Sequence, residues 1–101
     1  MKSKPVRIRS EAQNEIEEAF DHYRAESREA AERFLTEVAL SLELIRLHPH
    51  LYPMSTRNTR RRVLRSFPYL LIYQEKRDVI LVIAVTHAKR RPDHWTERLK
   101  Q

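Results

Sequence analysis

The sequence lacks both cysteine and glycine across its 101 residues. Without cysteine the chain has no disulfide, no thiol nucleophile and no thiolate metal site, which suits a reducing cytoplasm. Without glycine it cannot build the phosphate-binding loops of P-loop or dinucleotide-binding folds, because those loops need glycine where the backbone approaches the phosphate. These two absences exclude common classes of nucleotide-dependent enzyme, and we expect no cofactor.

Long hydrophobic runs are also missing. The longest apolar stretch, Val79–Val85, is far too short to cross a bilayer. The basic, polar segment 1–10 is not followed by the apolar run of a signal peptide. We therefore expect a cytoplasmic protein that does not enter membranes, and the chain length predicts a single domain over residues 1–101.

Positive charge gathers in the second half of the chain. From Arg57 to the C-terminus there are twelve Lys and Arg against four Asp and Glu, whereas the first 56 residues hold eight against ten. Charge concentrated in this way produces a strong surface field and favours an anionic partner, such as nucleic acid or an acidic protein segment. The C-terminal half is therefore where we expect the functional surface.

Two helices are predicted in the first half. Ser10 and Gln13 have the spacing of a capping box and predict a helix start at Ser10, with an end near Ala25. Ser27 predicts the N-cap of a second amphipathic helix, which stops before Pro49. Two helices joined by so short a connection form an antiparallel hairpin.

Strands are predicted on both sides of this hairpin. Val6 and Ile8 alternate with arginines and indicate a short edge strand. Segments 61–66, 69–74 and 79–87 are predicted as strands that pair antiparallel through short connections. The sequence thus predicts an α+β fold in which the helical hairpin packs on a small antiparallel sheet.

The last predicted strand needs cover on both faces, because Val79–Val85 is apolar at every position. The helical hairpin can cover one face. The other face needs either the C-terminal tail, with its single tryptophan Trp95, or a bound partner. We expect Trp95 to cap this face or to take part in recognition by stacking.

Arginines alternate along the segment 61–66. Arg61, Arg62 and Arg65 flank Val63 and Leu64, so a strand directs some guanidinium groups to each face. Such groups bind phosphates or carboxylates with two hydrogen bonds. The alternative is an edge strand that uses charge to avoid aggregation.

Histidines offer weaker candidates. His87 ends the apolar strand close to Lys89 and Arg90, where it can act as a general base or serve as a structural hydrogen-bonding group. His48 and His50 lie on a proline-rich connector without carboxylate or cysteine neighbours in sequence. We therefore predict no metal site.

The order of these segments resembles the ParE/RelE superfamily of bacterial toxins from type II toxin–antitoxin systems. The resemblance rests on the helical hairpin followed by Leu47-His48-Pro49, Tyr52-Pro53, Arg61-Arg62 with Leu64, Phe67 to Tyr73, and His87, Arg90, Pro92, Trp95 and Arg98. It implies a compact fold with two helices against an antiparallel sheet. It also implies a cognate antitoxin, whose acidic amphipathic segment wraps the toxin.

The superfamily contains two branches with different targets. Proteins similar to RelE are ribosome-dependent mRNA endonucleases that act without metal and carry an arginine in an R-L-x-Y strand. Proteins similar to ParE inhibit DNA gyrase by binding and serve in plasmid stabilisation. Here Leu70 stands where the nuclease arginine would align, in the strand Leu70–Tyr73.

The resemblance therefore favours a ParE-like toxin with no catalytic residues, acting on gyrase. One alternative is a RelE-like ribonuclease of ribosome-bound mRNA that uses Arg65, His87 and Arg90. A third hypothesis, based on charge alone, is a nontoxic nucleic-acid-binding protein. The residues expected to contact partners are Arg61, Arg62, Arg65, Lys89, Arg90, Arg91, Trp95 and Arg98.

Overall fold

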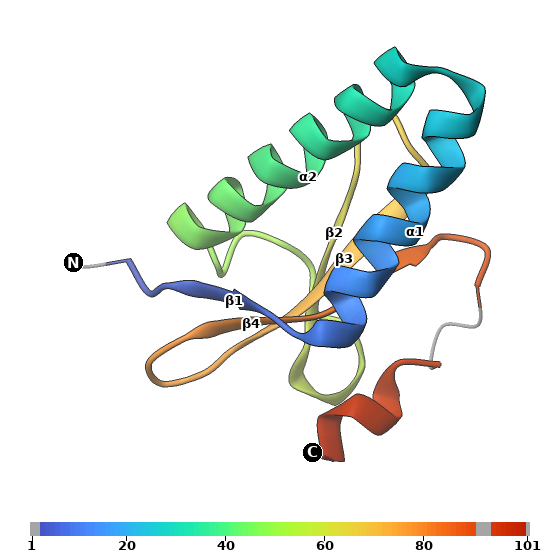
Figure 1. Ribbon diagram of the computed structural model, residues 1–101. Coiled ribbons are helices and arrows are strands. Elements are labelled where there is room, and N and C mark those ends of the chain that lie inside the picture. Colours follow the sequence, from blue (N-terminus) through green and yellow to red (C-terminus); the bar gives the residue numbers. More distant parts are fainter. Residues whose placement is uncertain (1–2, 91–93, 101) are drawn as a thin grey trace.

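A computed structural model describes residues 3–90 and 94–100 of the chain. In chain order the elements are β1 (Val6–Ile8), α1 (Ser10–Glu26), α2 (Arg28–Leu47), η1 (Thr56–Asn58), β2 (Arg60–Val63), β3 (Tyr69–Glu75), β4 (Ile80–His87) and η2 (Thr96–Lys100). Figure 1 shows the two helices as a hairpin over one side of the sheet, with the C-terminal segment on the other side. The predicted α+β class and helical hairpin are confirmed.

The two helices begin in different ways. Ser27 caps α2 as predicted, because its hydroxyl accepts a hydrogen bond from the Ala30 N–H at 2.9 Å. The capping box predicted for α1 is wrong. Arg9 occupies the N-cap position but its side chain makes no capping hydrogen bond and binds Glu11. Ser10 lies already in the helix, and the Gln13 amide donates to Glu17 instead.

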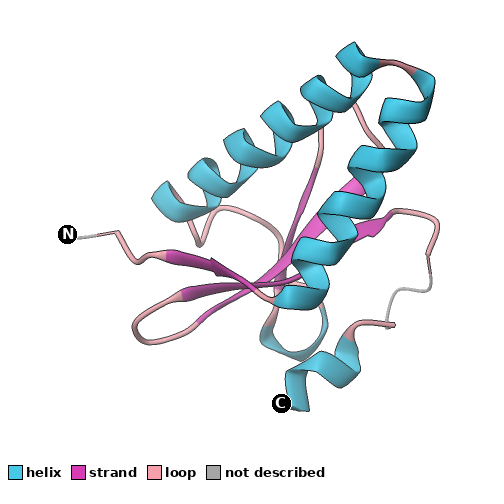
Figure 2. Ribbon diagram, in the orientation of Figure 1, coloured by secondary structure: helices cyan, strands magenta, loops and turns pink. Residues whose placement is uncertain are grey.

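The sheet is mixed, with the strand order β1-β4-β3-β2. β2, β3 and β4 are antiparallel neighbours, as predicted, but β1 pairs parallel with β4, with Val6 opposite Ile80. The expectation of a purely antiparallel sheet is therefore corrected. The chain between β1 and β4 contains the helical hairpin and also β2 and β3, so it is long enough for the crossover that a parallel pair requires. Figure 2 shows β1 beside β4 at the sheet edge.

β2 is shorter than the predicted strand 61–66, whereas the predicted bounds of β3 and β4 are confirmed within one residue. After Val63 the chain turns, and the Leu64 N–H donates to the Tyr69 carbonyl at 2.9 Å. This turn buries the side chains of Leu64 and Phe67 in the core. The free energy gained by burying these two apolar side chains is greater than that of extending β2 as an edge strand.

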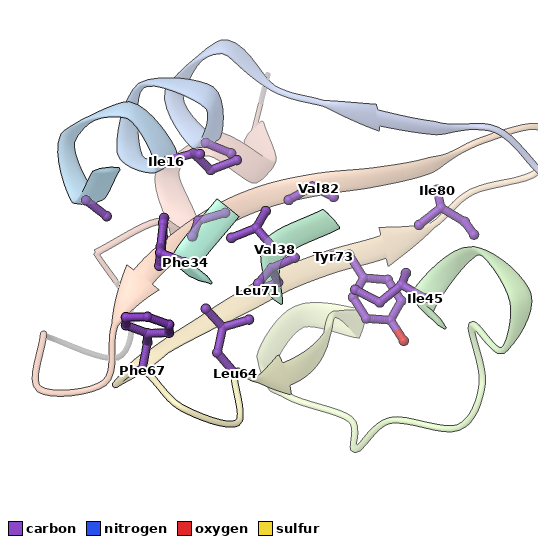
Figure 3. Close-up of a cluster of buried hydrophobic side chains, with 13 residues drawn as sticks. Ile16, Phe34, Val38, Ile45, Leu64, Phe67, Leu71, Tyr73, Ile80 and Val82 are labelled. Atoms are coloured by element: carbon purple, nitrogen blue, oxygen red, sulfur yellow. The ribbon is translucent and has the colours of Figure 1, made fainter. Parts of the chain in front are cut away.

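The main core lies between the helices and the sheet. Figure 3 shows Phe34 and Val38 of α2 and Ile16 of α1 packed over Leu71 and Val82 of the sheet. All five side chains are buried. This core holds the helical hairpin on the sheet. It thereby fixes which face of α1 lies against the outer edge of β4.

A second apolar cluster lies on the opposite face of the sheet. Ile72, Ile83 and Ala84 pack there against Trp95, which is 2% exposed. The C-terminal tail therefore covers the face that the sequence left open to either a tail or a partner. Trp95 thus caps this face from within, which is one of the two roles expected of it, and its contact with a partner stays a prediction.

Within the described residues, neither long helix combines the length and apolar character needed to span a membrane.

Candidate functional site: a cationic surface and two hollows

The arginines of β2 divide between the two faces of the sheet. The Arg62 Nε donates to the Ser41 hydroxyl at 2.9 Å, and its guanidinium carbon lies 5.1 Å from the centre of the Tyr52 ring. Arg60 donates to the Tyr52 carbonyl at 2.8 Å. Arg61 points to the other face and is exposed. Arg60 and Arg62 therefore fasten β2 to the helices and connector, while Arg61 is available to a partner.

A hollow of about 660 Å³ separates α2 from the end of β2. It is lined by Glu37, Leu40, Ser41, Leu44, Arg62, Arg65 and Ser66. Leu40 is 54% exposed, and Arg65 is exposed at the rim. The hollow therefore combines an open apolar wall with guanidinium groups.

Glu37 supplies the one carboxylate in the lining of this hollow. Burial acts to raise its pKa, but a hydrogen bond from the Ser66 N–H at 2.9 Å and the charge of Arg65 outweigh it and lower the pKa. Glu37 is therefore ionised at neutral pH, and it partly offsets the positive charge of Arg65.

A second, smaller hollow of about 180 Å³ lies between α1 and the end of β4. Its lining comprises Glu15, Glu18, Ala19, His22, Tyr69, Val85, His87 and Arg90. The Tyr69 and His87 rings meet edge to face with their centres 5.2 Å apart, and the His87 Nδ1 accepts a bond from the Lys89 N–H. Burial raises the pKa of Tyr69, while the charge of Arg90 acts in the opposite direction.

The alternative nuclease set is thus only partly assembled. His87 and Arg90 line the same hollow, whereas Arg65 lines the other one. Tyr69, which the sequence did not single out as a site residue, is the closest aromatic partner of His87.

Exposed cations without internal carboxylate partners mark the surface of the second half. Arg61, Lys89 and Arg90 are exposed, and no carboxylate among the described residues lies within ion-pair distance of them. Arg91 lies outside the described residues. These guanidinium and ammonium groups can bind carboxylates or phosphates of another molecule.

Arg98 is placed differently from the other cations. Its two terminal nitrogens donate to the two carboxylate oxygens of Glu15 at 2.9 and 3.1 Å, and one also donates to the Ile83 carbonyl at 3.0 Å. Only 16% of the Arg98 side chain is exposed. An internal carboxylate therefore neutralises Arg98, and its expected contact with a partner stays a prediction.

Glu15 is not among the residues that the sequence singled out as partner-binding or catalytic. Its spacing carried a signal, since it follows Ala12 by three residues and precedes Ala19 by four, and both are buried. A carboxylate on the apolar stripe of a helix indicates a buried partner.

No group of three or more His, Asp or Glu side chains placed to hold a metal ion is found within residues 3–90 and 94–100. On the connector, the ring of His50 contacts the carboxylate of Glu75, which also accepts a bond from Lys4 at 2.9 Å. These contacts tie the connector to the end of β3.

Comparison with known proteins agrees with this architecture. Residues 6–92 match the family model described as the ParE toxin of the type II toxin–antitoxin system parDE. Among solved structures, one from the chromosomal ParDE toxin–antitoxin system of P. aeruginosa superposes with a TM-score of 0.76, covering 86% of this chain and 98% of that chain at 13% identity. No curated protein matches the sequence.

Proposed function

Because the chain belongs to the ParE family of toxins from type II toxin–antitoxin systems, we propose that it inhibits DNA gyrase by binding and is neutralised by a cognate antitoxin. The observation that carries the proposal is the exposed cationic set Arg61, Lys89 and Arg90, which has no ion-pair partner among the described residues. A protein that acts by binding needs charged groups that its own fold leaves unsatisfied.

The cationic set supports docking onto an acidic surface or a DNA-bearing complex. Arginine binds carboxylates and phosphates through two parallel hydrogen bonds, and lysine adds a mobile point charge. Lys89 and Arg90 follow the end of β4, where the Ala88 N–H donates to the Pro68 carbonyl at 2.7 Å and holds the start of this turn. Arg91 extends the set in sequence.

A supercoiling assay with purified gyrase tests this proposal. The wild-type protein should inhibit supercoiling, and the double variant Lys89→Ala, Arg90→Ala should need at least about tenfold more protein for the same inhibition, since a loss of 1.4 kcal/mol corresponds to tenfold. The matched control is Arg28→Ala, because Arg28 is 87% exposed but pairs with Glu32 at the start of α2. Undiminished supercoiling at a large molar excess of wild-type protein would refute the proposal.

The hollow between α2 and β2 supports a site for the antitoxin. An acidic amphipathic segment can place apolar side chains on Leu40 and Leu44 and carboxylates near Arg62 and Arg65, which line the same hollow. Its occupant in the cell is expected to be encoded in the neighbouring reading frame.

A charge placed in this hollow should block the antitoxin. Leu40→Glu should weaken antitoxin binding at least about tenfold in calorimetry, because it replaces an apolar contact and its carboxylate competes with those of the antitoxin for Arg62 and Arg65, which line the same hollow. The control is Leu35→Glu, since Leu35 is also exposed on α2 but does not line the hollow. Equal affinities for the two variants would place the antitoxin elsewhere.

The hollow at the end of β4 supports a second candidate function. His87, Arg90 and Tyr69 line it together, which is the kind of set that a metal-independent ribonuclease needs for proton transfer and phosphate binding. Toe-printing of ribosome-bound mRNA would detect cleavage, and His87→Ala should abolish it. Absence of cleavage by the wild-type protein would remove this candidate.

A further inference from the structure

The outer edge of β4 changes its hydrogen-bonding pattern halfway along the strand. Up to Val82 the edge pairs with the N-terminal segment, since the Ile80 N–H donates to the Pro5 carbonyl and the Arg9 N–H to the Val82 carbonyl. Ile72 then pairs with Ala84 and Tyr73 with Val82, which leaves Ile83 as an extra residue, a β-bulge. Beyond the bulge no strand covers this edge within the described residues.

One ion pair takes the place of the missing strand. The Glu15 carboxylate accepts a bond from the Val85 N–H at 3.0 Å, and Arg98 donates to the Ile83 carbonyl at 3.0 Å. The same two side chains bind each other through both carboxylate oxygens. Helix α1 and the C-terminal segment are thus joined across the backbone of β4.

The bulge also explains the apolar contacts of the C-terminal segment. An extra residue directs both Ile83 and Ala84 to the face opposite the helices, where they pack on Trp95 and, at the margin, on Leu99. The ion pair lies at the edge of this cluster, with 11% of the Glu15 side chain and 16% of the Arg98 side chain exposed. Apolar burial and the ion pair therefore hold the same segment.

We infer that Glu15 and Arg98 form a clasp, meaning the ion pair that closes the C-terminal segment on β4, and that they act as positioning residues for Lys89 and Arg90. The exposed turn with Lys89 and Arg90 lies between two anchored points, His87 at the end of β4 and Trp95 in the apolar cluster. Breaking the Glu15–Arg98 ion pair releases the second of these points, Trp95, from the apolar cluster. The positioning role rests on the proposed function, because it assumes that Lys89 and Arg90 bind gyrase.

Trp95 gives a direct readout of closure, since it is the only tryptophan in the chain. In the full-length protein, Glu15→Gln should shift its fluorescence to longer wavelength and increase quenching by acrylamide, because the indole becomes accessible to solvent. Far-UV circular dichroism should keep its helical signal, since the main core lies on the other face. The matched control is Glu17→Gln, an exposed position two residues further along α1.

A graded series at position 98 separates positioning from simple loss of stability. Lysine keeps the charge but cannot bind both Glu15 oxygens and the Ile83 carbonyl in one planar arrangement. Quenching should therefore increase from wild type to Arg98→Lys to Arg98→Met, and gyrase inhibition should fall in the same order, by at least about tenfold for Arg98→Met.

The outcomes for the clasp and for the gyrase proposal are distinct. Unchanged Trp95 quenching in both Glu15→Gln and Arg98→Met would overturn the clasp, whatever gyrase does. Increased quenching with undiminished inhibition would overturn the positioning role. If wild-type protein fails to inhibit gyrase, the proposed function falls, and growth arrest on induced expression then replaces inhibition as the readout of the same variant series.

Discussion

Replacing Trp95 with alanine should lower the free energy of unfolding by about 3 kcal/mol, at the lower end of the range for large-to-small changes of buried aromatic residues. The indole is 2% exposed and packs against Ile72, Ile83 and Ala84. The substitution removes its apolar contacts and leaves these three side chains open to water.

The magnitude follows from burial and from position in the chain. An aromatic side chain of this size buries about 200 Å², which at about 25 cal/mol per Å² corresponds to roughly 5 kcal/mol as an upper bound. The loss cannot exceed what docking of the C-terminal segment contributes, because that segment can detach while the main core stays folded. Because of this limit, we expect a loss of about 3 kcal/mol, at the lower end of the range for buried aromatic residues.

Urea denaturation followed by far-UV circular dichroism measures the change, since the substitution removes the fluorophore. Trp95→Phe keeps an aromatic ring and is expected to lose less than half as much as Trp95→Ala. A loss below about 0.5 kcal/mol for Trp95→Ala, the range of ordinary surface changes, would contradict the assignment of Trp95 as a buried cap.

Three other substitutions test local contacts by denaturation. Ser27→Ala should lower the free energy of unfolding by about 1 kcal/mol, because it removes the side-chain cap of α2. Ser10→Ala should change it by no more than about 0.5 kcal/mol, because Ser10 caps no helix. Equal effects of the two substitutions would contradict the assigned helix starts. Burial raises the pKa of Tyr73 to about 12, so its phenol is protonated, and it donates a hydrogen bond to the Pro49 carbonyl at 2.7 Å. Tyr73→Phe removes this bond and should lower the free energy of unfolding by about 1 kcal/mol. An unchanged urea midpoint would exclude the bond. The hydrogen bond from Lys4 lowers the pKa of Glu75 below its ordinary 4.5, although burial acts in the opposite direction. Lys4→Met removes this bond and should lower the free energy of unfolding by at most about 1 kcal/mol at pH 7. A lowered carboxyl pKa stabilises the fold fully above the ordinary value, and this stabilisation is lost as the pH falls through the lowered pKa. The stabilities of wild type and Lys4→Met should therefore converge as the pH falls below the ordinary pKa and through the lowered one. A difference that stays constant throughout acid titration would contradict the pairing.

The resemblance found in the sequence is confirmed at the level of the ParE family and of the fold. Helices and strands were predictable because hydrophobic periodicity, the cap at Ser27 and the stop before Pro49 act over a few neighbouring residues. The cap predicted at Ser10 failed for a local reason as well, since the helix already includes Ser10 and the preceding Arg9 holds the cap position.

The candidate site was predictable as a list of cations but not as a surface. Arg61 and Arg98 look alike in sequence, and both stand in a basic context. The fold exposes the first and buries the second against Glu15, 83 residues away. Pairing over such a separation leaves no periodic signal in a single sequence.

By itself the sequence determined the chemistry that the protein lacks, the order of its helices and strands, the basic second half and the family it belongs to. Only the tertiary structure decided that β1 runs parallel to β4, that the C-terminal tail closes the second sheet face, and which charges stay free. The reason is physical: local patterns record which side chains avoid water, whereas strand partners, bulges and buried ion pairs depend on segments that meet only when the chain has folded.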